Sequence, residues 1–414
     1  MQTLARANVR SEPAASGPSY VDRLGGLVFV CCLILCAVLA VQFYLSGWDR
    51  FTQFPAAVAD APHEDLAAFY RASELMAERR AGDAYDPDMF RSGLGDGNQR
   101  LLMLNPPHFF LLIEPLSYIG YGWAKALILA GFVVAFAAIA VLARSPKSMA
   151  AFLILSGGGY YAAVTLNISV LVVAAIVFAL VQAERRPFVS AIFLALATVK
   201  PQYGLLVPVF LVACGYWRCL WWTCAVTVLM LAVSLWHVGV DVWLSFFNAL
   251  ATPAYQAYAD VTAPGNLTLQ SAAGKLGFGG IGRYALQAAA LLSVGAVIWR
   301  MRARVSRASL IGITLLGSGL VAPSLMYYSW PIFMAGLCFL QGERRAWPLA
   351  LQVSAGLLWL QPIWATVLFT YHMQSAQSYS LLVTANIVVA FVCAVLFAGR
   401  AGSCEDAPQR QSAI

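Results

Sequence analysis

Apolar stretches about as long as a lipid bilayer is thick recur along the whole chain. The first runs from Leu24 to Leu45, and another occupies residues 123–143. A helix rises 1.5 Å per residue, so about 20 apolar residues cross the roughly 30 Å of hydrocarbon in a membrane. Short clusters of arginine and lysine and two longer polar loops separate these stretches. The pattern predicts an all-α polytopic membrane protein.

The basic clusters indicate the topology. Cytoplasmic loops are enriched in Lys and Arg, so we place the polar segment 1–23 and the later clusters on the inner side. This placement predicts about 12 transmembrane helices within a single membrane domain, residues 24–400, and an inner tail at 401–414. The two large loops, 46–122 and 239–283, then lie outside.

One apolar segment is predicted not to cross the membrane. Residues 101–119 contain Asn105-Pro106-Pro107 and Glu114-Pro115. Prolines interrupt helices and a carboxylate is expensive in hydrocarbon. We therefore expect a helix at the outer membrane surface here and assign the second crossing to residues 123–143.

Composition narrows the class of protein. Of the 414 residues, 61% are hydrophobic and only 11% are charged, with a mean hydropathy of +0.73. Such a chain has too few polar side chains to cover a water-exposed surface, which excludes a soluble enzyme and an ordinary nucleic-acid binder. We interpret the net charge of +7 as a consequence of topology. The predicted inner loops between crossings are too short for a nucleotide-binding domain, so any chemistry is expected at the outer face.

The first outer loop is acidic and begins with a candidate general base. Residues 46–100 carry ten of the 19 acidic residues. From Asp65 to Arg80 the pattern predicts an amphipathic helix lying along the membrane surface, with Leu66 and Phe69 on its apolar face. Asp65 is either an N-cap whose carboxylate accepts a backbone N–H or a base that deprotonates a hydroxyl.

Further along this loop, Gly82 to Asp88 contains three acids among turn-forming residues. Three carboxylates within six residues also suit a divalent cation. We favour the turn, because Gly and Asp-Pro both interrupt regular structure.

A lysine beside a proline marks a second candidate. Val199-Lys200-Pro201-Gln202 stands between two apolar stretches, and the proline should break the helix there. The freed backbone groups are then expected to line a cavity. Lys200 either snorkels to the membrane surface or binds an anion such as a lipid phosphate.

Two later segments carry polar and aromatic candidates. The second outer loop holds Asn266, Lys275 and Arg283, which either bind phosphate or sugar or belong to a solvated loop. The segment 322–331 contains Tyr327 and Tyr328, which either contact substrate or form part of an aromatic belt. The four histidines, His63, His108, His237 and His372, show no ligand spacing, so we expect neither a metal site nor a cofactor.

In this order, the segments resemble glycosyltransferase family 87, a group of polyprenol-phosphate-mannose-dependent mannosyltransferases with the GT-C membrane architecture. The matching pieces are the eight residues from Asp65, then Ala84-Tyr85-Asp86, then Asn105 to Pro115, then Lys200-Pro201-Gln202. The resemblance covers roughly residues 20–400.

The resemblance implies a GT-C-like bundle with juxtamembrane helices at its outer face and transfer of a sugar, with mannose expected, from a polyprenyl-phosphate donor. The acceptor would be a glycolipid or glycan at the outer face of a bacterial inner membrane, and the product would be inverted. Asp65 would be the base, and Lys200, with Lys275 or Arg283, would bind the donor phosphate. The residues implied in substrate binding are Tyr70, Arg71, Gln202, Asn266, Tyr327 and Tyr328.

The sequence departs from the family at two places. Tyr327, Tyr328 and Ser329 stand where many relatives carry His or Asp, and Thr165-Leu166 stands where relatives often have Gly-Gln. Two other functions fit a chain of this composition. A transporter or flippase would also use broken helices and a buried charge, and a non-catalytic scaffold would need neither Asp65 nor Lys200.

Overall fold

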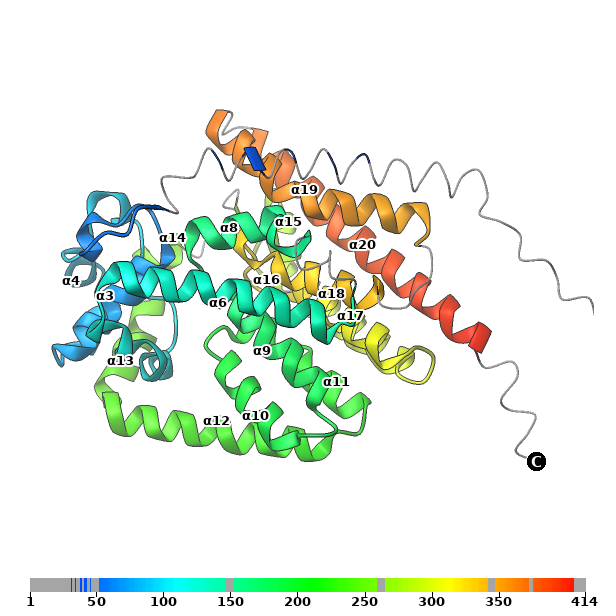
Figure 1. The fold of residues 1–414 in the computed structure, drawn as a ribbon, viewed down its shortest axis with the longest axis horizontal. Helices are drawn as coiled ribbons and strands as arrows, with labels where there is room; N and C mark the ends of the chain where they lie inside the picture. The colour runs from blue at the N-terminus through cyan, green and yellow to red at the C-terminus, as the bar shows by residue number, and fades with distance from the viewer. Residues whose placement is uncertain are drawn as a thin grey trace, which may run out of the picture.

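The computed structural model describes residues 52–145, 152–258, 265–341, 347–371 and 375–405, and a few single positions between 31 and 45. All of the regular elements in these ranges are helices (Figure 1), in agreement with the predicted class. The predicted tail 1–23, nearly all of the predicted first crossing at 24–45, and residues 406–414 lie outside the described part.

The described part of the predicted first outer loop folds into short helices at one end of the molecule (Figure 1). Its longest helix, α3, spans Asp65–Ala77 and is buried around most of its circumference, so protein rather than lipid covers it. The other elements are η1 (Val58–Asp60), η2 (Ala81–Tyr85), α4 (Pro87–Arg91), η3 (Asp96–Asn98), η4 (Pro107–Phe109), α5 (Phe110–Ile113) and η5 (Glu114–Tyr118). Segment 101–119 is therefore three short helical pieces and not a single surface helix.

The acidic turn takes a definite form. The Asp86 carboxylate accepts hydrogen bonds from the backbone N–H groups of Asp88 and Met89, at 2.9 and 3.0 Å, and so caps α4. Asp83 pairs with Arg80 at 2.7 Å. Two of the three acids therefore stabilise the local fold of the loop.

Four helices in the described residues are long and apolar enough to cross a membrane. They are α6 (Tyr121–Leu142), α12 (Trp217–Val238), α16 (Gly280–Met301) and the stretch Tyr379–Arg400 within α20 (Ser375–Glu405). Shorter apolar helices are α9 (Ser169–Gln182), α10 (Pro187–Ala197), the stretch Pro201–Ala213 that ends with α11 (Val207–Ala213), α13 (Val240–Leu250), α17 (Arg307–Val321) and part of α19 (Leu349–Tyr371). Twelve crossings thus remain a prediction, and α20 continues five residues beyond the predicted boundary at 400.

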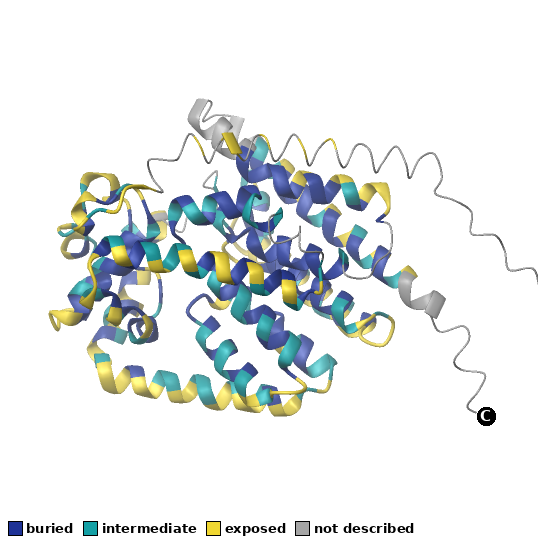
Figure 2. Cartoon of the chain, in the orientation of Figure 1, coloured by how far each residue is buried: buried dark blue, intermediate teal, exposed yellow. Residues whose placement is uncertain are grey.

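Helices α17 and α18 (Pro331–Gln341) form the centre of the bundle. Every residue from Ser309 to Val321 in α17 is buried, and α18 is buried from Pro331 to Leu340 (Figure 2). A Cβ atom at Gly312 would lie only 2.9 Å from the carbonyl oxygen of Gly336. Small residues let two helices approach this closely in membrane proteins, where packing drives association.

Helix α12 forms one edge and is mostly exposed (Figure 2). Its exposed side chains include Trp221, Val228 and Trp236, the last 84% exposed. Such an apolar surface fits hydrocarbon rather than water.

The helix break predicted at Pro201 is present. Helix α10 ends at Ala197, Pro201 begins the short helix η6 (Pro201–Tyr203), and α11 starts at Val207. A second break separates α17 from α18 and contains η7 (Tyr327–Ser329). The remaining helices are α8 (Gly157–Thr165), α14 (Pro253–Tyr258) and α15 (Leu269–Lys275).

Candidate functional site

Asp65 is the first residue of α3, and its carboxylate contacts a side chain rather than the helix backbone. Glu64 occupies the N-cap position and makes no side-chain cap hydrogen bond. The side-chain amide of Asn167, between α8 and α9, donates a 2.5 Å hydrogen bond to Asp65 Oδ2. The interpretation of Asp65 as an N-cap is therefore wrong, since a neighbour 102 positions away engages its carboxylate.

Lys200 lies at the break after α10 with its ammonium group buried. Its Nζ donates to Asn167 Oδ1 at 2.6 Å and to Ser169 Oγ at 3.0 Å. The ring of Tyr328 lies 4.9 Å from Nζ, at cation–π distance. The side chain points into the protein and does not snorkel to a surface, because it is only 7% exposed.

A hydrogen-bond network behind Lys200 ties both helix breaks together. Tyr203 in η6 donates to Ser329 Oγ in η7 at 2.6 Å, and its hydroxyl lies 2.9 Å from Ser169 Oγ. All three side chains are buried. The network fixes Lys200 and Tyr328 relative to the start of α9.

The segment Asn105–His108 packs against the same break from the outer loop. Asn105 donates its side-chain amide to the carbonyl oxygen of Val199 at 2.9 Å, which satisfies one group freed by the break. His108 Nε2 lies 3.2 Å from the Thr198 hydroxyl. Burial lowers the pKa of His108 to about 4, so its ring is neutral near pH 7.

Asp65 and Lys200 both line a cavity of about 390 Å³. Its polar lining residues include Asp65, Asn105, Asn167, Lys200, Gln202 and Tyr328, and its apolar ones include Phe69, Leu101, Leu102, Leu104 and Phe246. The site is thus amphipathic, with a carboxylate and an ammonium group beside apolar walls. Four of the residues predicted from sequence, Asp65, Lys200, Gln202 and Tyr328, line it.

The environment of Asp65 suits proton transfer. Burial raises the pKa of its carboxyl, while the hydrogen bond from Asn167 and the positive charge of Lys200 lower it. A carboxylate with a raised pKa accepts a proton more readily than an exposed aspartate does.

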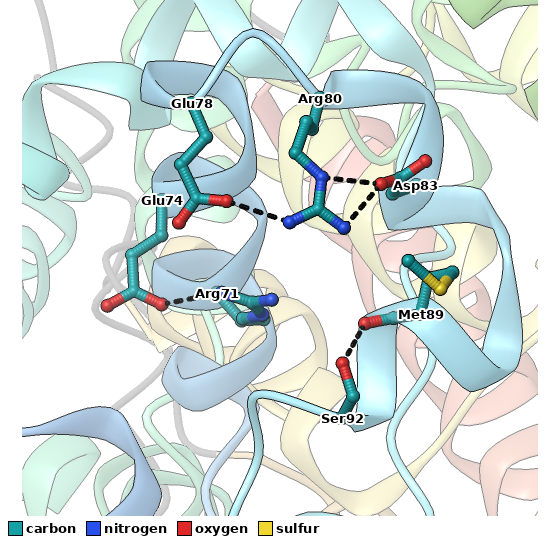
Figure 3. Close-up of polar contacts among 7 residues, drawn as sticks. All are labelled: Arg71, Glu74, Glu78, Arg80, Asp83, Met89 and Ser92. Carbon is teal, nitrogen blue, oxygen red and sulfur yellow. Dashed lines mark hydrogen bonds and ion pairs between the residues drawn. The ribbon is translucent and has the colours of Figure 1, made fainter.

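Two predicted substrate-binding residues on α3 do not line the cavity. Tyr70 donates its hydroxyl to the carbonyl oxygen of Ile119 at 2.8 Å, and its ring packs edge-on against Tyr121. Arg71 forms an ion pair with Glu74 at 3.3 Å (Figure 3). Both contacts lie within the outer loop and its junction with α6.

The other predicted residues do not line this cavity either. Lys275 Nζ donates to the carbonyl oxygen of Asn266 and to Ser380 Oγ, both at 2.8 Å, so it joins the second outer loop to α20. Arg283 lies in the first turn of α16. The Tyr327 ring packs between Tyr161 and Trp330 and is buried.

The sequence interpretation missed Asn167 and a buried ion pair beside Asp65. Lys125 in α6 pairs with Glu64 at 2.5 Å, both side chains being 1% exposed, and Tyr121 donates to the same carboxylate at 2.7 Å. The available signal was a lysine within an apolar run, where a charge is expected to have a partner. Asn167 had a weaker signal, as a polar residue between two apolar stretches.

The described residues contain no group of three or more His, Cys, Asp or Glu side chains that could hold a metal ion. The polar groups that line the cavity are one carboxylate, one ammonium group, amides and hydroxyls.

Comparison with known proteins identifies a family. The model of Glycosyltransferase family 87 matches residues 104–329. The matched region includes Asn105, Asn167, Lys200 and Tyr328, and Asp65 precedes it. No curated protein and no solved structure matches the chain. Because the family match spans more than half of the 414 residues, the chain belongs to glycosyltransferase family 87 and is a membrane glycosyltransferase.

Proposed function

We propose that this enzyme transfers a sugar, with mannose expected, from a polyprenyl-phosphate donor to a hydroxyl of a glycolipid or glycan. Transfer takes place at the outer face of a bacterial inner membrane. The observation that supports it best is the cavity that Asp65 and Lys200 share, with apolar walls beside them.

The reaction needs a base and a group that stabilises the leaving phosphate. The Asp65 carboxylate takes the proton of the acceptor hydroxyl, whose oxygen attacks the anomeric carbon from the side opposite the phosphate. The bond from that carbon to the phosphate oxygen breaks, and its electron pair remains on the polyprenyl phosphate. Attack from the opposite side inverts the configuration at the anomeric carbon.

Lys200 is suited to the leaving phosphate. A buried ammonium group stabilises the negative charge that develops on the phosphate more strongly than an exposed one would. Leu101, Leu102, Leu104 and Phe246 offer an apolar surface to the first isoprene units. We assign Gln202 and Tyr328 to contacts with the sugar, and keep Lys275 and Arg283 as candidates for a more distant part of the donor.

The test is sugar transfer by purified protein in lipid. A short-chain polyprenyl phosphate mannose is offered with a panel of glycolipid and glycan acceptors, and mass spectrometry identifies the products. We expect a product of inverted configuration from the wild type and a loss of at least about a hundredfold in Asp65→Asn, the usual range for a removed general base. Equal transfer by the two proteins would contradict the role of Asp65.

A further inference from the structure

The side chain of Asn167 lies between the proposed base and the proposed phosphate-binding cation. Its Nδ2 contacts Asp65 at 2.5 Å and its Oδ1 contacts Lys200 at 2.6 Å. No direct hydrogen bond or ion pair joins Asp65 to Lys200, although both side chains belong to the described part of the chain. One amide thus bridges two opposite charges that do not touch.

The orientation of this amide is fixed by three donors. Oδ1 accepts hydrogen bonds from Lys200, from the backbone N–H of Ser169 at 3.0 Å and from the Ser169 hydroxyl at 2.5 Å. An amide nitrogen in that position would face the Lys200 ammonium group and the Ser169 backbone N–H, neither of which can accept a hydrogen bond. The NH₂ group must therefore point towards Asp65.

The backbone delivers Asn167 to this place through a strained turn. Leu166, which ends α8, has a φ of 51° in the left-handed region, and α9 begins at Ser169. Non-glycine residues adopt this conformation infrequently, and it persists where surrounding contacts enforce it. The surrounding contacts here include the hydrogen bonds of the Asn167 side chain.

We propose that Asn167 is a positioning residue that keeps the Asp65 carboxylate and the Lys200 ammonium group apart; this inference rests on the function proposed above. Opposite charges in a poorly solvated cavity attract strongly. In direct contact the carboxylate would be a weaker base, and the ammonium group would no longer be available to a phosphate. The Glu64–Lys125 pair, at 2.5 Å, is an example of such contact in the same protein.

The charged and titratable groups around Asp65 are known from the structure. They are Lys200 at the helix break, His63 in the segment before α3, Tyr203 in η6 and Tyr121 in α6. Substitution at position 167 removes none of these four groups from the protein. A change in the titration of Asp65 would then report on the separation that Asn167 maintains.

The first experiment is the pH dependence of kcat/KM for sugar transfer in Asn167→Ala and Asn167→Asp. Activity falls as the pH falls through the pKa of the base. In Asn167→Ala, Asp65 loses the amide hydrogen bond, which by itself raises its pKa. Lys200 can then approach and donate to Asp65 directly, and an opposite charge in contact lowers the pKa more, so we expect the acid limb to move down by about 1 pH unit. In Asn167→Asp, a second carboxylate raises the pKa of Asp65, so we expect the acid limb to move to higher pH. Opposite shifts in two variants would not follow from general loss of structure.

The second experiment needs no substrate. The rate of Asp65 modification by a water-soluble carbodiimide is measured against pH by peptide mass spectrometry, because the reagent attacks the protonated carboxyl. We expect the same opposite shifts. Asn386→Ala is the matched control, since Asn386 is another buried amide, bonded to the carbonyl oxygen of Ser354 at 3.2 Å and outside the cavity.

The outcomes separate the two proposals. If the wild-type protein transfers no sugar while the carbodiimide titrations of the two variants shift in opposite directions, the proposed function is overturned and the positioning role of Asn167 is retained. If both variants titrate as the wild type does and their melting temperatures are unchanged, only the positioning role of Asn167 is overturned. Asn167→Ser serves in place of the alanine variant if that protein does not fold, and the same downward shift is required of it.

Discussion

Two neighbouring carboxylates, Glu64 and Asp65, each lie close to a lysine, but only one of them contacts its lysine directly. Glu64 contacts Lys125 directly at 2.5 Å, and both side chains are 1% exposed. Asp65 is separated from Lys200 by the Asn167 amide, and both line a cavity of about 390 Å³.

The difference lies in what remains available to a ligand. The Glu64 carboxylate accepts hydrogen bonds from Lys125 and Tyr121, and the backbone N–H of Glu64 donates to Asn98 Oδ1 at 3.1 Å. The buried Glu64–Lys125 pair therefore joins α3 to α6 and offers no exposed surface to a substrate. Two of the three protons of the Lys200 ammonium group are used by Asn167 and Ser169, while the group still borders the cavity. A stabilising pair and a reactive one thus differ by a single intervening amide.

The largest expected effect is a loss of stability when the Glu64–Lys125 pair is broken. Lys125→Ala leaves a buried carboxylate without its cation, and removal of one partner from a buried pair costs about 3–5 kcal/mol. Unfolding in detergent should show this loss. The double variant Glu64→Gln/Lys125→Met should recover part of it. A loss below about 1 kcal/mol, typical of exposed pairs, would contradict the structural role.

The next largest effect concerns Lys200, the cation that lines the cavity. Lys200→Ala should weaken donor binding by about tenfold or more, because hydrogen bonds to charged groups contribute about 1.5–3 kcal/mol. Titration with the polyprenyl-phosphate donor measures it. Arg307→Ala is the control, since Arg307 contacts Glu184 and the carbonyl oxygen of Leu180 away from the cavity. Unchanged affinity in Lys200→Ala would remove Lys200 from the donor site.

A smaller effect follows from the pKa of Asp65. Burial raises that pKa in the folded protein, so the ionised form opposes folding and is least favourable at neutral pH. Asp65→Asn should therefore unfold at an equal or higher temperature than the wild type near pH 7, with the advantage vanishing once acid protonates Asp65 in the wild type. A lower melting temperature at pH 7 would mean that Asp65, like Glu64, stabilises the fold.

The smallest effect is expected at Arg71. Its ion pair with Glu74 is partly exposed, with side chains 12% and 32% accessible. Pairs of this kind contribute about 0.2–1 kcal/mol. Arg71→Gln should change the melting temperature little and KM by less than about threefold. A large rise in KM would instead support the substrate-binding role that the family resemblance implies.

Local patterns in the sequence predicted much of this arrangement. The start of a helix at Asp65, the break at Lys200-Pro201 and the break at 322–331 all follow from residues close in the chain. The cavity then unites Asp65, Lys200, Gln202 and Tyr328 as candidates.

Long-range contacts account for what was missed. Asn167 reaches Asp65 across 102 positions and Lys125 reaches Glu64 across 61, and no local pattern encodes either. Tyr70 and Arg71 follow Asp65 directly, but successive residues on a helix point in different directions. Several apolar stretches fold into helices of fewer than 18 residues, so the number of crossings could not be read from hydropathy alone.

The most direct test compares Asp65→Asn with Glu64→Gln in one preparation, measuring sugar transfer per folded molecule and unfolding temperature for each. We predict that Asp65→Asn loses transfer and keeps its stability, whereas Glu64→Gln loses stability and keeps most of its transfer. Folded Glu64→Gln protein that loses transfer as completely as Asp65→Asn would contradict the distinction between the two carboxylates. Transfer retained by Asp65→Asn would contradict the assignment of the base.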